Sequence, residues 1–392
     1  MNLKINFGTI TNSQWWKEMS CTFHEQIKQY KNSGILILYN ADADGFVSTH
    51  FLCRIYNKIA RKQSRLFFKA VWNYEFKFEW LEEYLFDKSI SLVICLDLPI
   101  IQEPEVLHSL TLSGKKFLIY DHHIVPQKYL PIEGVSYFNS RLLDNEKSNH
   151  PTSIISALLA DHVVNLTYNE YLIAAIGLLG DQSLHLYPEY YSLLQEKSRD
   201  LFNSDNLWKS RFGKITSLIN AFFRANPSKN PKDIHWVLLN LIQKEDDFIN
   251  IIDSLNSKYG FEIAQKMVND EVNYYINKLS NSYTEQINKE FICLVLPMRT
   301  FSVGIIATIL AKRNIAPMVA IGFNADNTIQ FEIRRADSEK RSIIDILNIQ
   351  KKYFTPLTAG GHPMAAGALV KKGDENKFCI SFTKAMRETL KG

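Results

Sequence analysis

The chain is poor in cysteine, has no long apolar run and carries no excess of one charge. Its five cysteines are scattered over 392 residues without a Cys-x-x-Cys pair, which argues against a disulfide scaffold or a zinc site. We therefore expect reduced, mostly buried thiols in a cytoplasmic protein. No apolar stretch reaches the roughly 18 residues of a membrane span, and the first residues lack the apolar core of a secretion signal.

The balance of charges excludes one class of function. With 45 basic and 41 acidic residues, the net charge is only +4. A surface that coats nucleic acid non-specifically needs a much larger basic excess, so none is expected here, although a local basic groove is compatible with these numbers.

The length and the apolar pattern predict an α/β protein with more than one domain. Short apolar runs alternate with helical spacing, which predicts a mostly parallel sheet with helices on both faces. Strands are expected at residues 34–40, 65–72, 91–96 and 116–120, and helices at 46–60, 78–86 and 104–112. A helical stretch follows, and the α/β pattern returns in a smaller C-terminal domain. The predicted domains are residues 1–195, a helical connector at 196–289, and 290–392.

Acidic and imidazole side chains stand where several of these apolar runs end. They are Asp42, Asp44, Asp97, Asp121, His122, His123 and Asp181. The carboxyl ends of strands form the ligand-binding edge of open α/β sheets, so we expect these side chains to meet there. Hard oxygen donors with an imidazole and no thiolate favour Mn²⁺ or Mg²⁺.

Each of these sites also has a simpler interpretation. Asp42-x-Asp44-Gly45 is a common surface turn, and Asp97 can be a loop acid or a helix cap. Single histidines are usually structural. Asp181 ends a helical apolar run, where the helix dipole disfavours a carboxylate unless a cation lies nearby.

The order and spacing of the sites resemble the four motifs of the DHH phosphoesterases. The run Gly360-Gly361-His362-Pro363-Met364-Ala365-Ala366-Gly367 resembles the glycine-rich signature of the family's C-terminal domain. This resemblance covers roughly residues 34–185 and 290–392. It implies a pair of Mn²⁺ or Mg²⁺ ions, and a water activated for attack on a phosphoester.

The resemblance also implies a role for each residue. Asp42 and Asp44 serve different ions, Asp97 bridges both, and His122 and Asp181 complete the metal ligands. His123 lies near the substrate phosphate, with Asp121 orienting an imidazole. The chain departs from the family pattern at Leu38, where many members carry a histidine, so Asn40 or water would complete the shell of the first ion.

In the C-terminal domain the resemblance implies a substrate-binding role for Arg334, Gly360, Gly361 and His362. A guanidinium can donate two parallel hydrogen bonds to one phosphate, and glycine backbone N–H groups can bind a phosphate oxygen or a nucleotide. A plain glycine turn and a solvated arginine are the alternatives. The helix start at residues 303–308 is similar to that of RecJ-type members.

These features favour a RecJ-like exonuclease acting on single-stranded nucleic acid. The alternatives are a phosphodiesterase for short oligonucleotides, adenosine bisphosphate or cyclic dinucleotides, a polyphosphatase, and a non-catalytic nucleic-acid-binding relative. We expect no membrane partner, and the sequence leaves the oligomeric state open.

Overall fold

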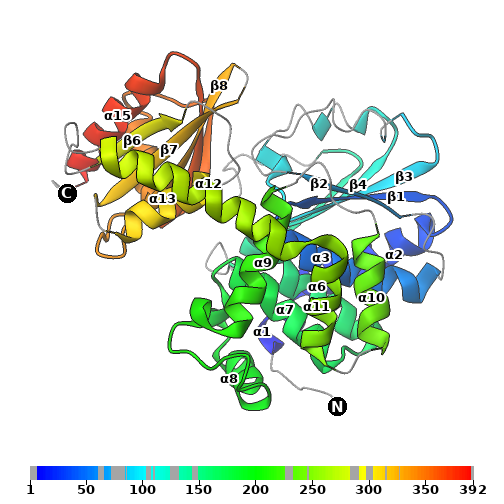
Figure 1. Ribbon diagram of the computed structural model, residues 1–392. Coiled ribbons are helices and arrows are strands. Elements are labelled where there is room, and N and C mark those ends of the chain that lie inside the picture. Colours follow the sequence, from blue (N-terminus) through cyan, green and yellow to red (C-terminus); the bar gives the residue numbers. More distant parts are fainter. Residues whose placement is uncertain are drawn as a thin grey trace. The chain divides into compact units, whose positions relative to one another are not determined.

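The computed structural model describes residues 7–60, 66–71, 84, 86–102, 107–108, 111–123, 132–143, 149–225, 233–244, 247–282, 291–296, 303–313, 316–325 and 327–389. The chain forms two compact units, Met1–Gln265 and Lys266–Gly392. Each unit contains a β-sheet packed against helices (Figure 1). The expected helices at residues 78–86 and 104–112 lie largely outside the described residues.

The first unit is built on a five-stranded sheet whose neighbouring strands are all parallel. Its strands are β1 (Gly34–Asn40), β2 (Leu66–Val71), β3 (Ile90–Leu96), β4 (Lys116–Asp121) and β5 (Val135–Asn139). Their spatial order is β2-β1-β3-β4-β5. The order changes direction between β1 and β3, and open α/β sheets bind ligands at the carboxyl ends of strands beside such a switch. The predicted parallel α/β sheet is confirmed.

Both faces of this sheet are buried, as expected for parallel strands. Ile35 and Ile37 of β1 point into one core, and Leu36 and Leu38 point into the opposite one. The first core is covered by α2 (Gln14–Tyr30), α3 (Ala43–Ala60), α6 (Thr152–Val164) and α7 (Tyr168–Gly180). The short helix α1 (Gly8–Thr11) precedes them. The second core includes Leu98 and residues of the 3-10 helix η3 (Ile100–Gln102).

The helices that follow α7 pack largely on the first core. They are α8 (Pro188–Lys197), α9 (Arg211–Ala225), α10 (Ile234–Lys244) and α11 (Phe248–Tyr259); of the described side chains of the next helix, α12 (Phe261–Ser282), only Phe261 and Ala264 belong to this core. Three further 3-10 turns are η4 (Ser140–Leu143), η5 (Leu184–Leu186) and η6 (Leu207–Lys209). Phe212, Phe223 and Leu239 share a core with β1 and α3. The stretch expected to be a connector thus contributes to the packing of the first unit.

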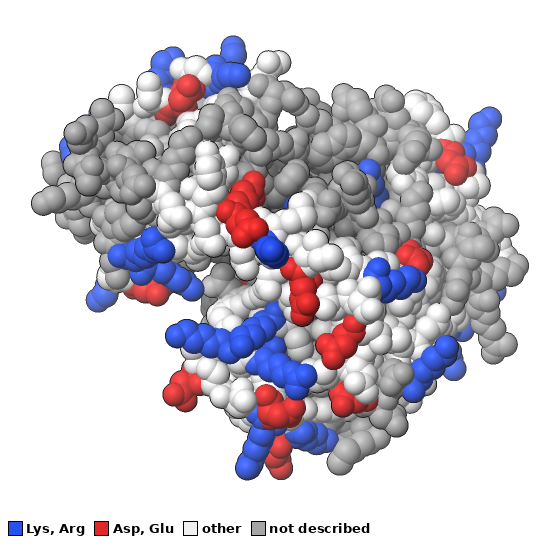
Figure 2. All heavy atoms as spheres, viewed as in Figure 1, with Lys and Arg blue, Asp and Glu red and all other residues white. Residues whose placement is uncertain are grey.

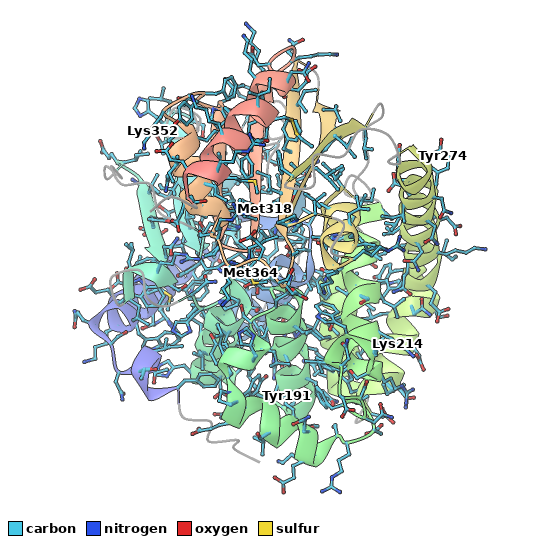
Figure 3. All side chains as sticks on the ribbon, turned by 90° about the vertical axis from the view of Figure 1, so that its left-hand side faces the viewer. Tyr191, Lys214, Tyr274, Met318, Lys352 and Met364 are labelled. Carbon is cyan, nitrogen blue, oxygen red and sulfur yellow. A yellow bond between two sulfur atoms is a disulfide. The ribbon has the colours of Figure 1, made fainter. Side chains whose placement is uncertain are left out.

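The second unit contains a mixed five-stranded sheet. Its strands are β6 (Phe291–Leu296), β7 (Met318–Ala325), β8 (Thr328–Arg335), β9 (Thr358–His362) and β10 (Ala365–Lys371), in the order β6-β7-β8-β10-β9. Helices α13 (Val303–Lys312), α14 (Ile343–Gln350) and α15 (Glu375–Glu388) complete the unit. Met318, labelled in Figure 3, is fully buried in a core with Phe331 and Phe378. This confirms the predicted smaller C-terminal α/β domain.

The glycine-rich run of the second unit forms a hairpin. Gly360, Gly361 and His362 lie in β9, and the turn at Pro363 and Met364 leads into β10. Met364 at this turn is labelled in Figure 3. Because β9 pairs with β10 on one side and with no other strand of the described sheet, it is an edge strand there.

The expectation of reduced thiols is wrong for one pair of cysteines. Cys293 in β6 and Cys379 in α15 form a disulfide, with their Cα atoms 6.0 Å apart. The two residues are 86 positions apart in the sequence and meet because α15 packs against β6. Cys21, Cys53 and Cys95 are free, and the latter two are buried as expected.

The surface agrees with the balanced composition. Figure 2 shows acidic and basic side chains interspersed over the described part of the face in view. In the described residues, no helix is both long enough and apolar enough to span a bilayer.

Candidate metal centre

The loop after β1 holds the first two carboxylates in a tight turn. β1 ends at Asn40 and α3 begins at Ala43, so Asp42 and Asp44 flank the start of the helix. The N–H of Gly45 donates to Asp42 Oδ1 at 3.0 Å. A methyl group on Gly45 would lie 2.2 Å from the carbonyl oxygen of Asn40, so only glycine fits there.

Asp44 is held by the beginning of α6. Its two carboxylate oxygens accept the backbone N–H groups of Thr152 and Ser153, each at 3.0 Å. The positive end of the helix dipole favours this buried charge. Gly177 of α7 permits the arrangement, because a methyl group there would lie 2.4 Å from Ser153 Oγ and 3.3 Å from Asp44 Oδ1.

Asp97 follows β3 with an unusual backbone. Its φ is 57°, in the left-handed region that non-glycine residues rarely adopt. Such a conformation costs on the order of 1 kcal/mol or more and is concentrated at functional sites. The carboxylate accepts Asn40 Nδ2 at 3.1 Å through Oδ2. Its other oxygen, Oδ1, is buried without a hydrogen-bond partner among the described residues.

His122 lies at the centre of the group. Its Nε2 is 3.1 Å from Asp97 Oδ1 and 3.9 Å from Asp44 Oδ2, and its Nδ1 is 3.9 Å from Asp181 Oδ2. Nδ1 also lies 2.9 Å from Asn149 Oδ1. An amide oxygen only accepts, so Nδ1 carries a proton in this contact, and a neutral ring would present the Nε2 lone pair toward Asp97.

His123 and Asp121 form a second pair at the end of β4. Asp121 Oδ1 lies 2.6 Å from His123 Nδ1 and also accepts the His123 backbone N–H at 3.2 Å. This fixes the imidazole with Nδ1 toward Asp121 and leaves Nε2 without that constraint. Asp121 thus orients His123, whereas Asn149 orients His122.

Asp42 and Asp181 complete the set at its margins. Asn40 Nδ2 donates to Asp42 Oδ2 at 2.5 Å as well as to Asp97. This one amide group therefore bridges the two carboxylates. Asp181 is the C-cap residue of α7, and its Oδ2 accepts the hydroxyl of Ser183 at 2.9 Å. The structure therefore brings all five predicted metal ligands to one edge of the sheet.

The charges of the group depend on one another. Burial raises the pKa of Asp44 to about 6, although the charge of His122 opposes this. Burial and the charges of Asp44 and Asp42 raise the pKa of Asp97 well above its ordinary value. Burial alone would lower the pKa of His122, but the carboxylates of Asp181 and Asp97 hold it well above its ordinary value.

The two residues of the second pair have opposite shifts. Burial would raise the pKa of Asp121, but the charge of His123 holds it below its ordinary value. Burial would lower the pKa of His123, but the Asp121 charge outweighs this effect and raises it. This is the behaviour of an ion pair.

The donor set suits a divalent cation. Asp97 Oδ1 and His122 Nε2 face each other at 3.1 Å, and the lone pairs of the carboxylate and of a neutral imidazole can bind the same cation. Asp97, His122 and His123 each offer a ligand atom, and these atoms lie within 4.8 Å of one another. Oxygen and imidazole donors without thiolate match Mn²⁺ and Mg²⁺.

The four predicted substrate-binding residues all lie in the second unit. Arg334 of β8 is 2.9 Å from Glu332 Oε2, and a methyl group on Gly304, at the start of α13, would lie 2.8 Å from its guanidinium. Arg334 and His362 are both paired with Ala365 of β10, so they occupy one row across the sheet. Gly360 and Gly361 precede His362 in β9.

Sequence reasoning missed several residues that position the site. Asn149 binds His122, and Asn220 of α9 accepts the backbone N–H of Ala43 at 2.9 Å. Arg141 donates from Nε to the carbonyl of His122 at 2.7 Å. Neither asparagine stands at a strand end or in a motif, so no pattern identified them.

Comparison with known families agrees with this geometry. Residues 34–169 match the DHH family, N-terminal domain. This stretch contains every predicted metal ligand except Asp181. The similarity to the DHH family thus rests on this N-terminal stretch of the chain. No curated protein matches the chain.

Solved structures show the same fold at low sequence identity. RecJ from Thermus thermophilus in complex with Mn²⁺ has a TM-score of 0.67 and 17% identity, covering 96% of this chain and 55% of that one. The chain thus spans about half the length of that RecJ. An exonuclease RecJ bound to manganese has a TM-score of 0.61 and 18% identity, covering 96% and 95%.

A third structure carries the same domain name. It is the DHH domain of a member of a family of ribosomal proteins, with a TM-score of 0.65 and 15% identity, covering 94% and 90%. At these identities the similarities describe the fold, and the chemistry has to be argued from the residues present.

Proposed function

We propose that the chain is a metal-dependent phosphodiesterase that removes nucleotides from single-stranded nucleic acid, as an exonuclease of the RecJ type. The observation that carries this proposal is the pair formed by Asp97 Oδ1 and His122 Nε2, 3.1 Å apart at the carboxyl edge of the sheet. Buried carboxylates of this number need cations. The names of the RecJ structures and the DHH match support the same interpretation.

Two Mn²⁺ or Mg²⁺ ions would be held by Asp42, Asp44, Asp97, His122 and Asp181, with Asp97 as the shared ligand. Bound there, they would supply a water of lowered pKa and offset charge on the phosphoryl oxygens. The protein's own part is to hold the carboxylates rigidly, through the start of α6 at Asp44 and through Asn40 at Asp97.

His123 is proposed to act on the substrate rather than as a ligand. Asp121 binds its Nδ1, so Nε2 is the atom available to donate to a phosphoryl oxygen or to the leaving oxygen. Asp121 orients the imidazole and favours its charged form. The role is that of a proton donor whose geometry is set before substrate arrives.

In the second unit, Arg334 and the hairpin of Gly360, Gly361 and His362 are proposed to bind the phosphate backbone. Arg334 lies beside the amino-terminal turn of α13, where backbone N–H groups favour an anion. The modest net charge of +4 predicts a grip on long strands that is weak and sensitive to salt.

The test is hydrolysis of end-labelled single strands of about 5 and about 40 nucleotides, a length range that spans the usual single-strand binding sites. We expect Mn²⁺-dependent release of mononucleotides, lost in Asp97→Ala and His122→Ala and kept in His185→Ala. His185 is an exposed histidine of η5 and serves as the matched control. Circular dichroism would confirm that each variant is folded.

The alternative substrates are distinguished in the same assay. Adenosine bisphosphate, a cyclic dinucleotide and polyphosphate would be offered separately to the same preparation. Hydrolysis confined to one of these would replace the nuclease assignment while keeping the metal chemistry. If nothing is cleaved while nucleic acid still binds, a non-catalytic binding role would replace the enzyme.

A further inference from the structure

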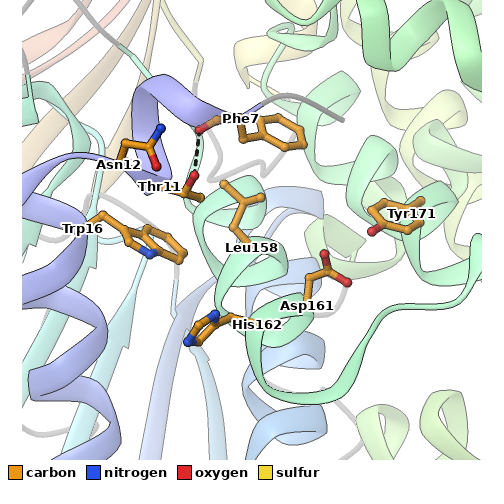
Figure 4. A pocket seen from close by; sticks show the side chains of 8 residues that line it. All are labelled: Phe7, Thr11, Asn12, Trp16, Leu158, Asp161, His162 and Tyr171. Atoms are coloured by element: carbon orange, nitrogen blue, oxygen red, sulfur yellow. Dashed lines mark hydrogen bonds between the residues drawn. The ribbon is translucent and has the colours of Figure 1, made fainter. Parts of the chain in front are cut away.

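A cavity of about 370 Å³ lies in the first unit, walled by α1, α2, α6 and α7 (Figure 4). Its walls include the rings of Phe7, Trp16 and Tyr171 and the carboxylate of Asp161. None of the residues assigned to the metal centre lines it. Its size is within the range of small-molecule sites, which hold a ligand with a few oriented polar groups on an apolar wall.

The polar side of the cavity is fixed before any ligand arrives. Asp161 Oδ1 accepts the backbone N–H of Leu166 at 2.8 Å, which holds the carboxylate at the end of α6. Figure 4 shows this carboxylate between His162 and Tyr171, with Asn12 on the opposite wall. The Tyr171 hydroxyl also interacts with Asp161. A carboxylate has about four acceptor positions, so Asp161 retains capacity for further donors.

The cavity is also connected to the metal centre through a chain of contacts. The ring of Phe7 lies 6.0 Å from that of Tyr187. The Tyr187 hydroxyl lies 2.7 Å from His150 Nδ1, two residues before Thr152, whose N–H binds Asp44. In addition, helix α6 joins the two sites. Its first N–H groups bind Asp44, and Asp161 lies further along the same helix, about 14 Å from them at the rise of an α-helix. The two sites are thus separate but share elements.

A metal ion is not the ligand that this cavity suits. Among its described lining residues, Asp161 and His162 are the only carboxylate and imidazole. Among the residues that the structure describes, the one group of metal-ligating side chains is that of Asp97, His122 and His123. Aromatic walls instead favour a flat ring, because rings stack on one another and every nucleobase has such a face.

We propose that this cavity binds a purine base that presents neighbouring N–H donors, as guanine does, with Asp161 accepting those donors and Trp16 beside the ring. Guanine offers a ring N–H and an exocyclic amine on one edge, and unpaired bases are read through such edges while stacked on aromatic side chains. The site is distinct from the metal centre and does not depend on the proposed nuclease activity.

The test is calorimetric titration of the metal-free protein with guanosine, in the presence of a chelator so that hydrolysis is absent. We expect saturable binding, weakened about tenfold or more in Asp161→Asn, because a site built to accept N–H donors discriminates strongly. Asparagine can still accept the Leu166 N–H, so this change keeps the local fold. Inosine, which lacks the exocyclic amine, should bind more weakly than guanosine.

Two further variants make the result specific to the cavity. Leu158→Trp places a large ring in the cavity and should abolish binding, with the unfolding midpoint showing that the variant is folded. Asp253→Asn, an exposed aspartate of α11, should bind as the parent does. Asp97→Ala should also bind guanosine while losing metal-dependent activity, which separates the two proposals.

Two outcomes would overturn the proposal. One is the absence of any binding of guanosine to the metal-free protein. The other is binding that is unchanged in both Asp161→Asn and Leu158→Trp, since the base would then occupy another place. Equal affinity for guanosine and inosine would show that the exocyclic amine is not recognised. The proposed contact of Asp161 with two neighbouring N–H donors would then be wrong.

Discussion

Asn149 and His122 form the contact that sets which imidazole nitrogen faces the carboxylates. The distance from Asn149 Oδ1 to His122 Nδ1 is 2.9 Å, and the opposite nitrogen lies 3.1 Å from Asp97 Oδ1. Partners of this kind fix the tautomer and orientation of metal-binding histidines. Asn149 precedes α6 and therefore acts from the same segment that holds Asp44.

Replacing Asn149 by alanine is expected to weaken Mn²⁺ binding by about 10- to 100-fold, the usual loss when such a partner is removed. The free imidazole would rotate and place the proton on either nitrogen. Calorimetric titration with Mn²⁺ measures the loss, and the matched control is Asn250→Ala on the exposed side of α11. Unchanged affinity in Asn149→Ala would show that the carboxylates alone orient His122.

Gly177→Ala is expected to disturb Asp44 from a neighbouring helix. The added methyl would lie 2.4 Å from Ser153 Oγ and 2.5 Å from Ser153 Cβ, so α6 and α7 must separate. Overpacking of this kind costs about 1–3 kcal/mol. We expect a lower free energy of unfolding by denaturant and weaker Mn²⁺ binding in the same variant.

A second change tests the cause. Ser153→Gly removes both atoms that the methyl meets, while its backbone N–H can still reach Asp44. The double variant should recover part of the stability lost in Gly177→Ala, which a double-mutant cycle measures as a coupling between the two residues. If the losses of stability in the two single variants simply add in the double variant, the clash does not involve Ser153.

Much of the site could be predicted from the sequence, because apolar runs that end in acids mark the ligand edge of a parallel sheet. β1, β3 and β4 lie at or within one residue of the predicted strands, and Asp97 and His122 meet as expected. The supporting contacts were not predictable. Asn149 reaches His122 from a loop 27 residues away, and Asp44 is bound by backbone groups that any sequence carries.

The second unit shows another limit. Strand β9 contains Gly360 and Gly361, and glycine has little preference for strands, so a plain turn is the alternative that the sequence leaves open beside a phosphate-binding role. Its pairing with β10 decides the outcome, since hydrogen bonds with a neighbouring strand outweigh local preference. The substrate roles of Arg334 and His362 and the predicted domain boundaries stay predictions.

Two buried histidines predict how stability depends on pH. His50 of α3 and His235 of α10 are fully buried, and none of their four ring nitrogens has a hydrogen-bond partner in the described structure. Burial lowers the pKa of His50 to about 3 and lowers that of His235 well below its ordinary value. Both therefore remain neutral in the folded protein at mildly acidic pH.

The unfolded chain binds these protons at an ordinary pKa of about 6.5, so stability is lost as the pH falls below that value. Each histidine contributes a slope of about 1.4 kcal/mol per pH unit. In His235→Phe the new ring would lie among those of Phe46 and Phe68. The variant should lose one proton's contribution to the slope of the unfolding free energy against pH. Denaturant unfolding at several pH values measures this slope. An equal reduction in exposed His185→Phe would contradict the assignment.

The disulfide predicts the number of free thiols and a gain in stability. The chain has five cysteines, of which Cys21, Cys53 and Cys95 are free, so thiol titration of the unreduced, denatured protein should find three. Because the bridge closes a segment with a sequence separation of 86, its loss in Cys379→Ser should lower the free energy of unfolding by about 4.6 kcal/mol on the chain-entropy argument. Exposed Cys21→Ser is the control and should leave stability unchanged. Five titratable thiols in the unreduced protein would show that Cys293 and Cys379 lie side by side without a bond.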